Sequence, residues 1–243
     1  MIDEIFGCGY WGKANPCVGR RRSTLCTASS FRLGLGFPPV AAIQGVMRAG
    51  FAKTAFSRGF SVVRLFPMLI LNPYTHDERF TLEADISING SHITFEYAVS
   101  DRAGLFELPT AAALWKKEDV SRRDGLWNST CFEAFLQPIG SEQYYEFNFS
   151  LQPAWQAYAF DGYRVPQPPP PALDFAIESL EWIPVQNRLV ARVENRSPFN
   201  KFQVGLTAIL QEKNQNKHYC ALAHKGPKPD FHLGESFTLL RGV

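Results

Sequence analysis

The sequence has no apolar run of the roughly 20 residues needed to cross a bilayer. The stretch over residues 62–71 is too short and is interrupted by Arg64 and Pro67. The amino terminus carries Asp3 and Glu4 where a signal peptide would carry positive charge. These absences predict a soluble cytoplasmic protein that has no membrane partner.

Cysteine is scarce, with five residues in the chain. Cys8, Cys17 and Cys26 are evenly and widely spaced, whereas zinc sites use cysteine pairs about two to four residues apart. Cys131 and Cys220 stand among strand-type residues. We expect these two to be buried free thiols, and we expect no metal site.

Acidic residues are nearly absent from residues 1–67, which hold two of them against nine Lys and Arg. The segment therefore has a net charge of +7, and the rest of a chain whose total is +2 carries −5. We interpret residues 1–67 as a poorly ordered basic extension or an over-extended start ahead of Met68. An Arg-rich targeting peptide and a nucleic-acid-binding arm remain alternatives, but the favoured interpretation includes no nucleic-acid partner.

No segment shows a persuasive amphipathic helix, and from residue 68 onward the dominant hydrophobic period is two. The predicted strands are Phe80–Ile88, Ile93–Val99, Thr130–Gln137, Tyr144–Leu151, Trp155–Phe160, Phe175–Trp182, Arg188–Glu194, Phe202–Leu210, Tyr219–His224 and Phe237–Leu240. Asn89–Gly90 predicts a type I′ hairpin turn between the first two. The prolines from Pro166 to Pro171 cannot join a ladder and predict an extended connection. Many short strands predict an all-β, two-sheet antiparallel β-sandwich over residues 68–243.

Motifs for catalysis are also missing. The chain has no nucleophile elbow, phosphate-cradling glycine loop or zinc-hydrolase helix. Glycoside cleavage needs two carboxyl groups flanking the bond. Glu133 with Glu146 or Asp230 has no spacing that marks a matched acid and base. We therefore expect a protein that is not an enzyme.

Several separated motifs resemble the bacterial DOMON-like proteins, which are related to the family-nine carbohydrate-binding modules. The resemblance covers about residues 68 to 241 and rests on the following segments: 124–127 (Asp-Gly-Leu-Trp), 130–133 (Thr-Cys-Phe-Glu), 145–150 (Tyr-Glu-Phe-Asn-Phe-Ser), Trp155, Tyr158, 163–164 (Tyr-Arg) and 223–232 (Ala-His-Lys-Gly-Pro-Lys-Pro-Asp-Phe-His).

This resemblance implies a jelly-roll-like sandwich with a ligand site on a concave face or at one end. In the carbohydrate-binding relatives a sugar lies between two aromatic rings, and a Glu accepts hydrogen bonds from its hydroxyls. Trp127 and Glu133 match the first ring and the acid. The second ring is a Trp in the loop before the last strand, where this chain has Phe231.

The predicted ligand-binding residues are Trp127, Glu133, Asn148, Arg164, His224, Lys228, Asp230, Phe231 and His232. The predicted ligand is a carbohydrate or another small molecule, held by aromatic stacking and hydroxyl hydrogen bonds.

Each residue also has a structural interpretation. Trp127 could seal the edge of the core, and Glu133 could be paired with Arg122, Arg123 or Arg164. The face that carries Glu146, Asn148 and Ser150 could be an ordinary solvated sheet face.

Three other ligand classes stay open. A metal could bind His224, Asp230 and His232, haem could bind through two histidines, and a protein partner could bind the aromatic surface. The favoured interpretation has no cofactor, and the oligomeric state is left undetermined.

Overall fold

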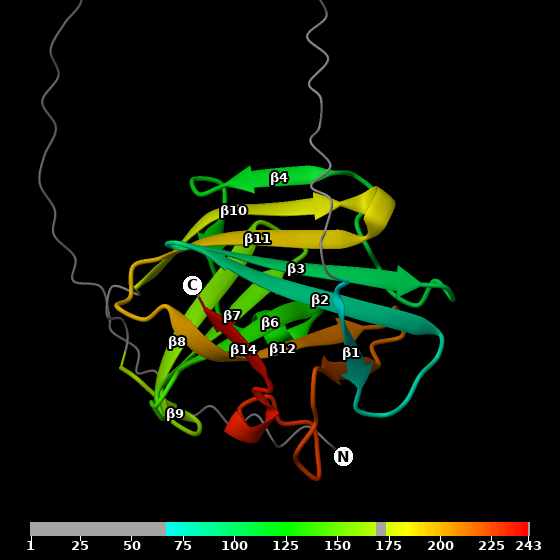
Figure 1. Ribbon diagram of the computed structural model, residues 1–243. Coiled ribbons are helices and arrows are strands. Elements are labelled where there is room, and N and C mark those ends of the chain that lie inside the picture. The colour runs from blue at the N-terminus through cyan, green and yellow to red at the C-terminus, as the bar shows by residue number, and fades with distance from the viewer. Residues whose placement is uncertain (1–66, 169–173, 243) are drawn as a thin grey trace, which may run out of the picture. The chain divides into compact units, whose positions relative to one another are not determined.

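The chain forms two sheets that pack face to face (Figure 1), and all strand pairs are antiparallel except β5 with β8. The computed structural model describes residues 67–168 and 174–242. The predicted basic extension, apart from Pro67, therefore lies outside the described residues, as do residues 169–173 of the proline-rich connection. Within the described part, no helix is long and apolar enough to span a membrane. The predicted all-β sandwich is confirmed.

The first sheet has the strand order β4-β10-β11-β3-β2-β1 and the second has β1-β13-β12-β6-β7-β8-β5. In addition, β14 pairs with β12 and β9 pairs with β8. The bounds are β1 Leu69–Pro73, β2 Phe80–Asn89, β3 His92–Asp101, β4 Ala113–Lys116, β5 Ser121–Arg122, β6 Cys131–Pro138, β7 Tyr144–Ser150, β8 Ala154–Gly162, β9 Val165–Pro166, β10 Phe175–Ile183, β11 Arg188–Asn195, β12 Lys201–Gln211, β13 Lys217–Ala221 and β14 Leu239–Gly242. Three 3-10 turns complete the fold: η1 Leu126–Asn128, η2 Pro184–Gln186 and η3 Gly234–Ser236.

The β2–β3 hairpin has the predicted faces but a different turn. Asn89 pairs with His92, so the connection is Gly90–Ser91. Gly90 has φ 60°, and neither Asn89 nor Ser91 has a positive φ. The predicted type I′ turn at Asn89–Gly90 is therefore wrong by one residue. A glycine with positive φ at the first central position alone is typical of a type II′ turn.

Other predicted boundaries change as well, and the strand predicted at Tyr219–His224 runs from Lys217 to Ala221. Pro166 lies in the two-residue strand β9, opposite Phe160 of β8, so the prediction that it could not join a ladder is wrong. A proline is tolerated there because β9 is an edge strand that need not donate on its outer side. The last strand, β14, begins at Leu239 rather than Phe237, since Phe237 ends the turn η3.

The core between the sheets is aromatic. Phe95 of β3 lies 5.4 Å from Phe147 and 5.3 Å from Phe149 of β7, measured between ring centroids. The buried Tyr97 hydroxyl donates to the backbone oxygen of Glu133 at 2.6 Å, which ties β3 to β6 across the core. Cys131 and Cys220 are buried free thiols, as the sequence predicts.

The second sheet is buried on both faces. Phe132, Ala134 and Leu136 of β6 point into the core, whereas Phe135 belongs to a separate apolar cluster on the opposite side. That cluster includes Phe231 from the loop between β13 and β14. The side of the second sheet that faces away from the first sheet, called the outer face below, is therefore covered in part by this late loop.

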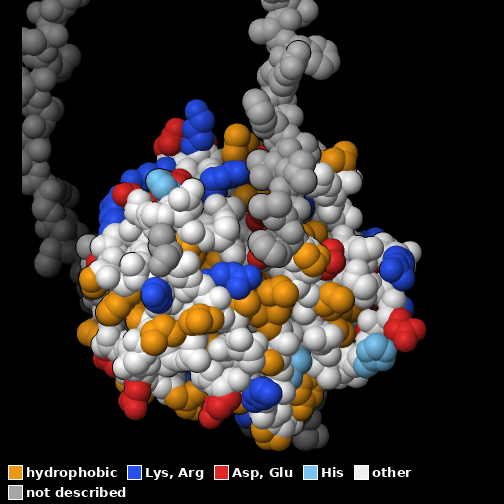
Figure 2. All heavy atoms as spheres, viewed as in Figure 1, with side chains coloured by type: hydrophobic (Ala, Val, Ile, Leu, Met, Phe, Trp, Pro, Cys, Tyr) orange, Lys and Arg blue, Asp and Glu red, His pale blue; other side chains and the backbone are white. Residues whose placement is uncertain are grey.

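The strand β1 belongs to both sheets. Residues Leu69 to Leu71 pair with β2, and Asn72 and Pro73 pair with β13. Figure 2 shows hydrophobic side chains across this side of the molecule. Ile70 of β1 and Leu240 of β14 are 59% and 65% exposed, so the surface near these strands is apolar.

Candidate functional site

Four polar side chains are buried side by side on the outer face. Strand pairing places Thr207 of β12 opposite Glu133 of β6, and Glu133 opposite Asn148 of β7. Glu146 lies two residues from Asn148, on the same face of β7. All four side chains are at most 6% exposed. We call Thr207, Glu133, Asn148 and Glu146 the buried polar row.

One acceptor of the row is unpaired in the described part of the chain. Asn148 Nδ2 donates to Glu146 Oε1 at 2.8 Å. Asn148 Oδ1 has no hydrogen-bond partner among the described residues, whereas the Thr207 hydroxyl can donate to the Glu133 carboxyl opposite it. Buried polar atoms are normally paired, and an unpaired one costs about 1–3 kcal/mol. The unpaired amide oxygen of Asn148 therefore marks this row as a candidate site.

The arginines that the sequence offered as partners for Glu133 lie elsewhere. Arg122 contacts Gln156, and its guanidinium lies 4.8 Å from the centre of the Trp155 ring. Arg164 Nη2 bonds to Asp230 Oδ1 at 2.9 Å. In the described ranges no ion pair reaches Glu133, so the structure does not support the alternative that Arg122, Arg123 or Arg164 pairs with it.

Burial sets the protonation of the row. Burial, together with the nearby charge of Glu146, raises the pKa of Glu133 well above its usual range. Burial raises the pKa of Glu146 to about 7, against the opposing effects of Asn148 and Arg164. The two carboxyl groups therefore do not both carry a charge in the unliganded protein near neutral pH.

A neutral histidine connects the row to the surface. His232 Nε2 lies 3.7 Å from Glu146 Oε2, and His232 Nδ1 lies 2.8 Å from the Tyr144 hydroxyl. The Arg164 backbone N–H donates to that hydroxyl oxygen at 3.1 Å, so the hydroxyl can donate to Nδ1. Burial, reinforced by the charge of Arg164, lowers the pKa of His232 to about 3. The imidazole is therefore uncharged at neutral pH.

An open groove of about 670 Å³ lies beside Tyr144 and His232. Its other lining residues are Gln137, Glu142, Gly162, Tyr163, Gln203, Leu233, Gly234, Glu235 and Phe237. Gln137 and Gln203 are cross-strand partners on β6 and β12, while Tyr163 is 55% exposed. The volume is in the range of small-molecule sites, and the lining combines aromatic rings with amide and carboxyl groups.

Asp230 organises the rim of this groove. Its carboxylate accepts hydrogen bonds from the Tyr163 hydroxyl at 2.6 Å, from Arg164 at 2.9 Å and from the backbone N–H of His232 at 3.1 Å. These bonds outweigh burial and lower its pKa. Arg164 has φ 55°, an uncommon conformation for a residue other than glycine. Such conformations occur where surrounding contacts fix them, often at functional sites.

The structure connects five of the nine predicted site residues. Glu133 and Asn148 belong to the buried polar row, and His232, Asp230 and Arg164 lead from it to the groove.

Trp127 and Phe231 lie on the apolar part of the outer face. Trp127 is half-buried, with its ring centroid 5.9 Å from that of Tyr158. Phe231 is 9% exposed, and its ring centroid lies 6.2 Å from that of Tyr219. Both rings join the cluster that covers this face, and neither of them lines the groove.

The remaining two predicted residues lie apart from the row. His224 Nε2 is 2.8 Å from the backbone oxygen of Asn72. Lys228 is exposed and forms no hydrogen bond or ion pair with the described residues. Because His224, Asp230 and His232 bond to different partners, the structure does not support the alternative that they ligate one metal.

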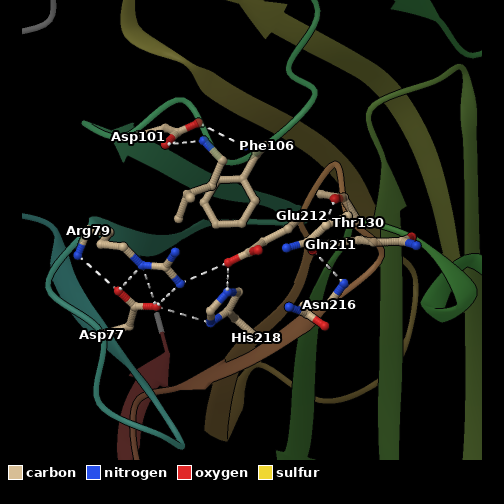
Figure 3. A network of polar contacts seen from close by, with 11 residues as sticks. Asp77, Arg79, Asp101, Phe106, Thr130, Gln211, Glu212, Asn216 and His218 are labelled. Atoms are coloured by element: carbon tan, nitrogen blue, oxygen red, sulfur yellow. Dashed lines mark hydrogen bonds and ion pairs between the residues drawn. The ribbon is translucent and has the colours of Figure 1, made fainter.

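A second polar cluster lies between the β1–β2 loop and the β12–β13 hairpin (Figure 3). Ligand atoms of Asp77, Glu212 and His218 lie within 4.8 Å of one another. Arg79 Nη2 bonds to Asp77 at 2.7 Å and to Glu212 at 3.0 Å, and His218 Nε2 is 2.8 Å from Glu212. Because Arg79 already supplies the positive charge between the two carboxylates, we interpret the cluster as a salt-bridge network that holds the two loops together.

Comparisons with known proteins give one distant structural likeness. No protein-family model and no curated protein matches the sequence. Among solved structures, a protein from Bacteroides uniformis that is provisionally named a carbohydrate-binding protein is similar, with 14% sequence identity and a TM-score of 0.46. The match covers 70% of this chain and 84% of the other. A likeness at this level carries no argument about function.

Proposed function

We propose that this protein is a non-catalytic module that binds a small carbohydrate in the groove on the outer face of the second sheet. The observation that carries the proposal is an open groove of about 670 Å³ whose lining residue His232 contacts Glu146 of the buried polar row, where Asn148 Oδ1 is unpaired among the described residues. Sugars present many hydroxyl donors on a ring with apolar C–H faces. They therefore match both an acceptor-rich site and an aromatic rim.

Tyr163 is the proposed stacking ring. It is 55% exposed, and the bond from its hydroxyl to Asp230 holds it at the rim. Gln137 and Gln203 each offer an amide donor and an amide acceptor from paired strands. His232 and Tyr144 close the inner end of the groove. The resemblance-based alternative places the sugar on Trp127 and Glu133 of the same face, with Phe231 as the opposing wall.

A binding screen with ring-deletion variants tests the function and separates the two positions. The full chain, Tyr163→Ala, Tyr163→Phe and Trp127→Ala are compared on a glycan array and by thermal shift. We expect the wild type to bind, and Tyr163→Phe to bind more weakly because the ring remains but loses its bond to Asp230. Tyr163→Ala should lose most binding, while Trp127→Ala should retain it. Loss of sugar binding only in Trp127→Ala would show that the sugar binds at the Trp127 ring instead. The absence of binding to any sugar would contradict the proposed function.

The same samples test the competing classes. Haem titration that produced a Soret band with saturable stoichiometry would favour a haem protein over a sugar-binding module. Hydrolysis of aryl glycosides by the wild type, lost in Glu133→Gln, would show that the protein is an enzyme. We expect neither result.

A further inference from the structure

The charged side chains that line the groove are all acidic. Glu142 and Glu235 are exposed at its edge, and Glu146 lies behind His232. No Lys or Arg is among the described residues of the lining. A ligand in the groove therefore meets negative charge at the rim and hydrogen-bond acceptors behind it.

The nearby cation is already paired. Arg164 bonds to Asp230 at 2.9 Å, and the side chain of Asp230 is only 7% exposed. If Arg164 turned to an anionic ligand, a largely buried carboxylate would lose its partner. Such a loss is strongly unfavourable. His232 supplies no positive charge either, because burial holds it in the neutral form.

We propose that the groove selects neutral and amine-bearing sugars and rejects sugars that carry carboxylate or sulfate groups. This inference rests on the proposed function and adds the chemical class of the ligand. An ammonium group brings donors and positive charge to Glu142 and Glu235, whereas a uronate brings acceptors and negative charge to the same place.

Two unpaired buried polar atoms lie close to the groove, although neither residue is part of its lining. Ser236, between the lining residues Glu235 and Phe237, is 5% exposed, and its Oγ has no partner among the described residues. Asn148 Oδ1, in the row behind His232, is likewise unpaired. Asn148 Oδ1 can only accept a hydrogen bond, and Ser236 Oγ can accept or donate one. The unpaired Asn148 oxygen adds one more acceptor to the acidic surroundings of the groove.

The size of the preference follows from Coulomb's law. Two unit charges about 4 Å apart in water interact by about 1 kcal/mol, and salt at about 0.15 M screens charges more than about 8 Å apart. Because of the two exposed carboxylates, the Kd of a cationic sugar should be lower than that of an anionic sugar by roughly tenfold or more at low salt. Most of that ratio should disappear at high salt.

Three disaccharides that differ in charge test the inference by isothermal titration calorimetry. They are built from glucosamine, from N-acetylglucosamine and from galacturonate, and each is titrated at low and high NaCl. The proteins are the full wild-type chain, the double variant Glu142→Gln/Glu235→Gln, and Glu83→Gln as a control. Glu83 is an exposed residue on β2 of the first sheet.

We expect the amine-bearing disaccharide to bind the wild type and the control at least about tenfold more tightly than the galacturonate at low salt. The ratio should fall to about threefold or less in the double variant and at high salt. Equal or tighter galacturonate binding, or a ratio unchanged in the double variant, would overturn the inference and leave the proposed function standing. Failure of every disaccharide to bind would overturn both.

Discussion

Replacing Glu146 with Gln should make the protein more stable at alkaline pH and leave it nearly unchanged at acidic pH. The carboxyl is buried, and burial raises its pKa from 4.5 to about 7. Below about pH 4.5 the group is protonated in both the folded and the unfolded state and contributes no pH dependence. Between that value and about pH 7 the unfolded state loses the proton first, so the folded wild type loses stability as pH rises.

The amount of stability lost follows from the size of the shift. A pKa displaced from 4.5 to about 7 corresponds to about 3 kcal/mol once the group is ionised in both states. Gln imitates the protonated acid and still offers an acceptor for Asn148 Nδ2. Glu146→Gln should therefore exceed the wild type by about 3 kcal/mol at pH 8 and by less than about 1 kcal/mol at pH 4.5.

Urea unfolding of both proteins across this pH range measures the difference. The charge of Glu146 contributes to the raised pKa of Glu133, so the difference between the two proteins reports the carboxyl at 146 together with its effect on Glu133. Glu83→Gln, at an exposed site, should differ from the wild type by less than about 0.5 kcal/mol at any pH. A stability gain for Glu146→Gln that is the same at pH 4.5 and pH 8 would refute the assignment of a raised pKa to Glu146.

Three further substitutions test other parts of the fold. Hydrogen bonds from Arg79 lower the pKa of Asp77 to about 2, so Asp77→Asn should lower the melting temperature by about 1–3 °C at pH 7. That stabilisation is lost as pH falls through about 2, so the melting temperatures of Asp77→Asn and the wild type should become equal at acid pH. A difference in melting temperature that is the same at pH 7 and at acid pH would contradict the interpretation as a salt-bridge network. Gly205→Ala puts a Cβ 2.7 Å from a ring carbon of Phe237 and should cost about 1–3 kcal/mol in urea unfolding. Tyr97→Phe removes the 2.6 Å bond to Glu133 and should cost about 1–2 kcal/mol; an unchanged midpoint would show that this bond contributes nothing.

The alternation of apolar and polar residues was sufficient to predict the long strands of the fold. The alternation in Phe80–Asn89 and His92–Asp101 identifies both strands and their buried faces, because a period of two over ten residues is difficult to mistake. The strand β4, Ala113–Lys116, was not predicted because four residues are too few to show a hydrophobic period. The hairpin turn was misplaced because Asn89–Gly90 and Gly90–Ser91 both contain a glycine able to adopt positive φ, and strand register decides between them.

The site was predictable only in part, because long-range pairing creates it. Glu133 was identifiable as a charge inside an apolar strand, and Asn148 follows from its place beside Glu146. Thr207 could not be found in this way, because it reaches Glu133 only through the pairing of β12 with β6. The exposed ring of Tyr163 becomes part of a groove only when the late loop brings Asp230 to it.

The double pairing of β1 has a consequence for synthesis of the protein. Leu69 to Leu71 can align on β2 as soon as residue 89 has been made, but Asn72 and Pro73 must wait for Cys220 and Ala221. Until that point the growing chain holds a partly formed strand with free amide and carbonyl groups, next to an interior that remains open on one side. A nascent chain stalled before residue 221 should therefore present this edge to chaperones, and release of the β13 segment should end that exposure.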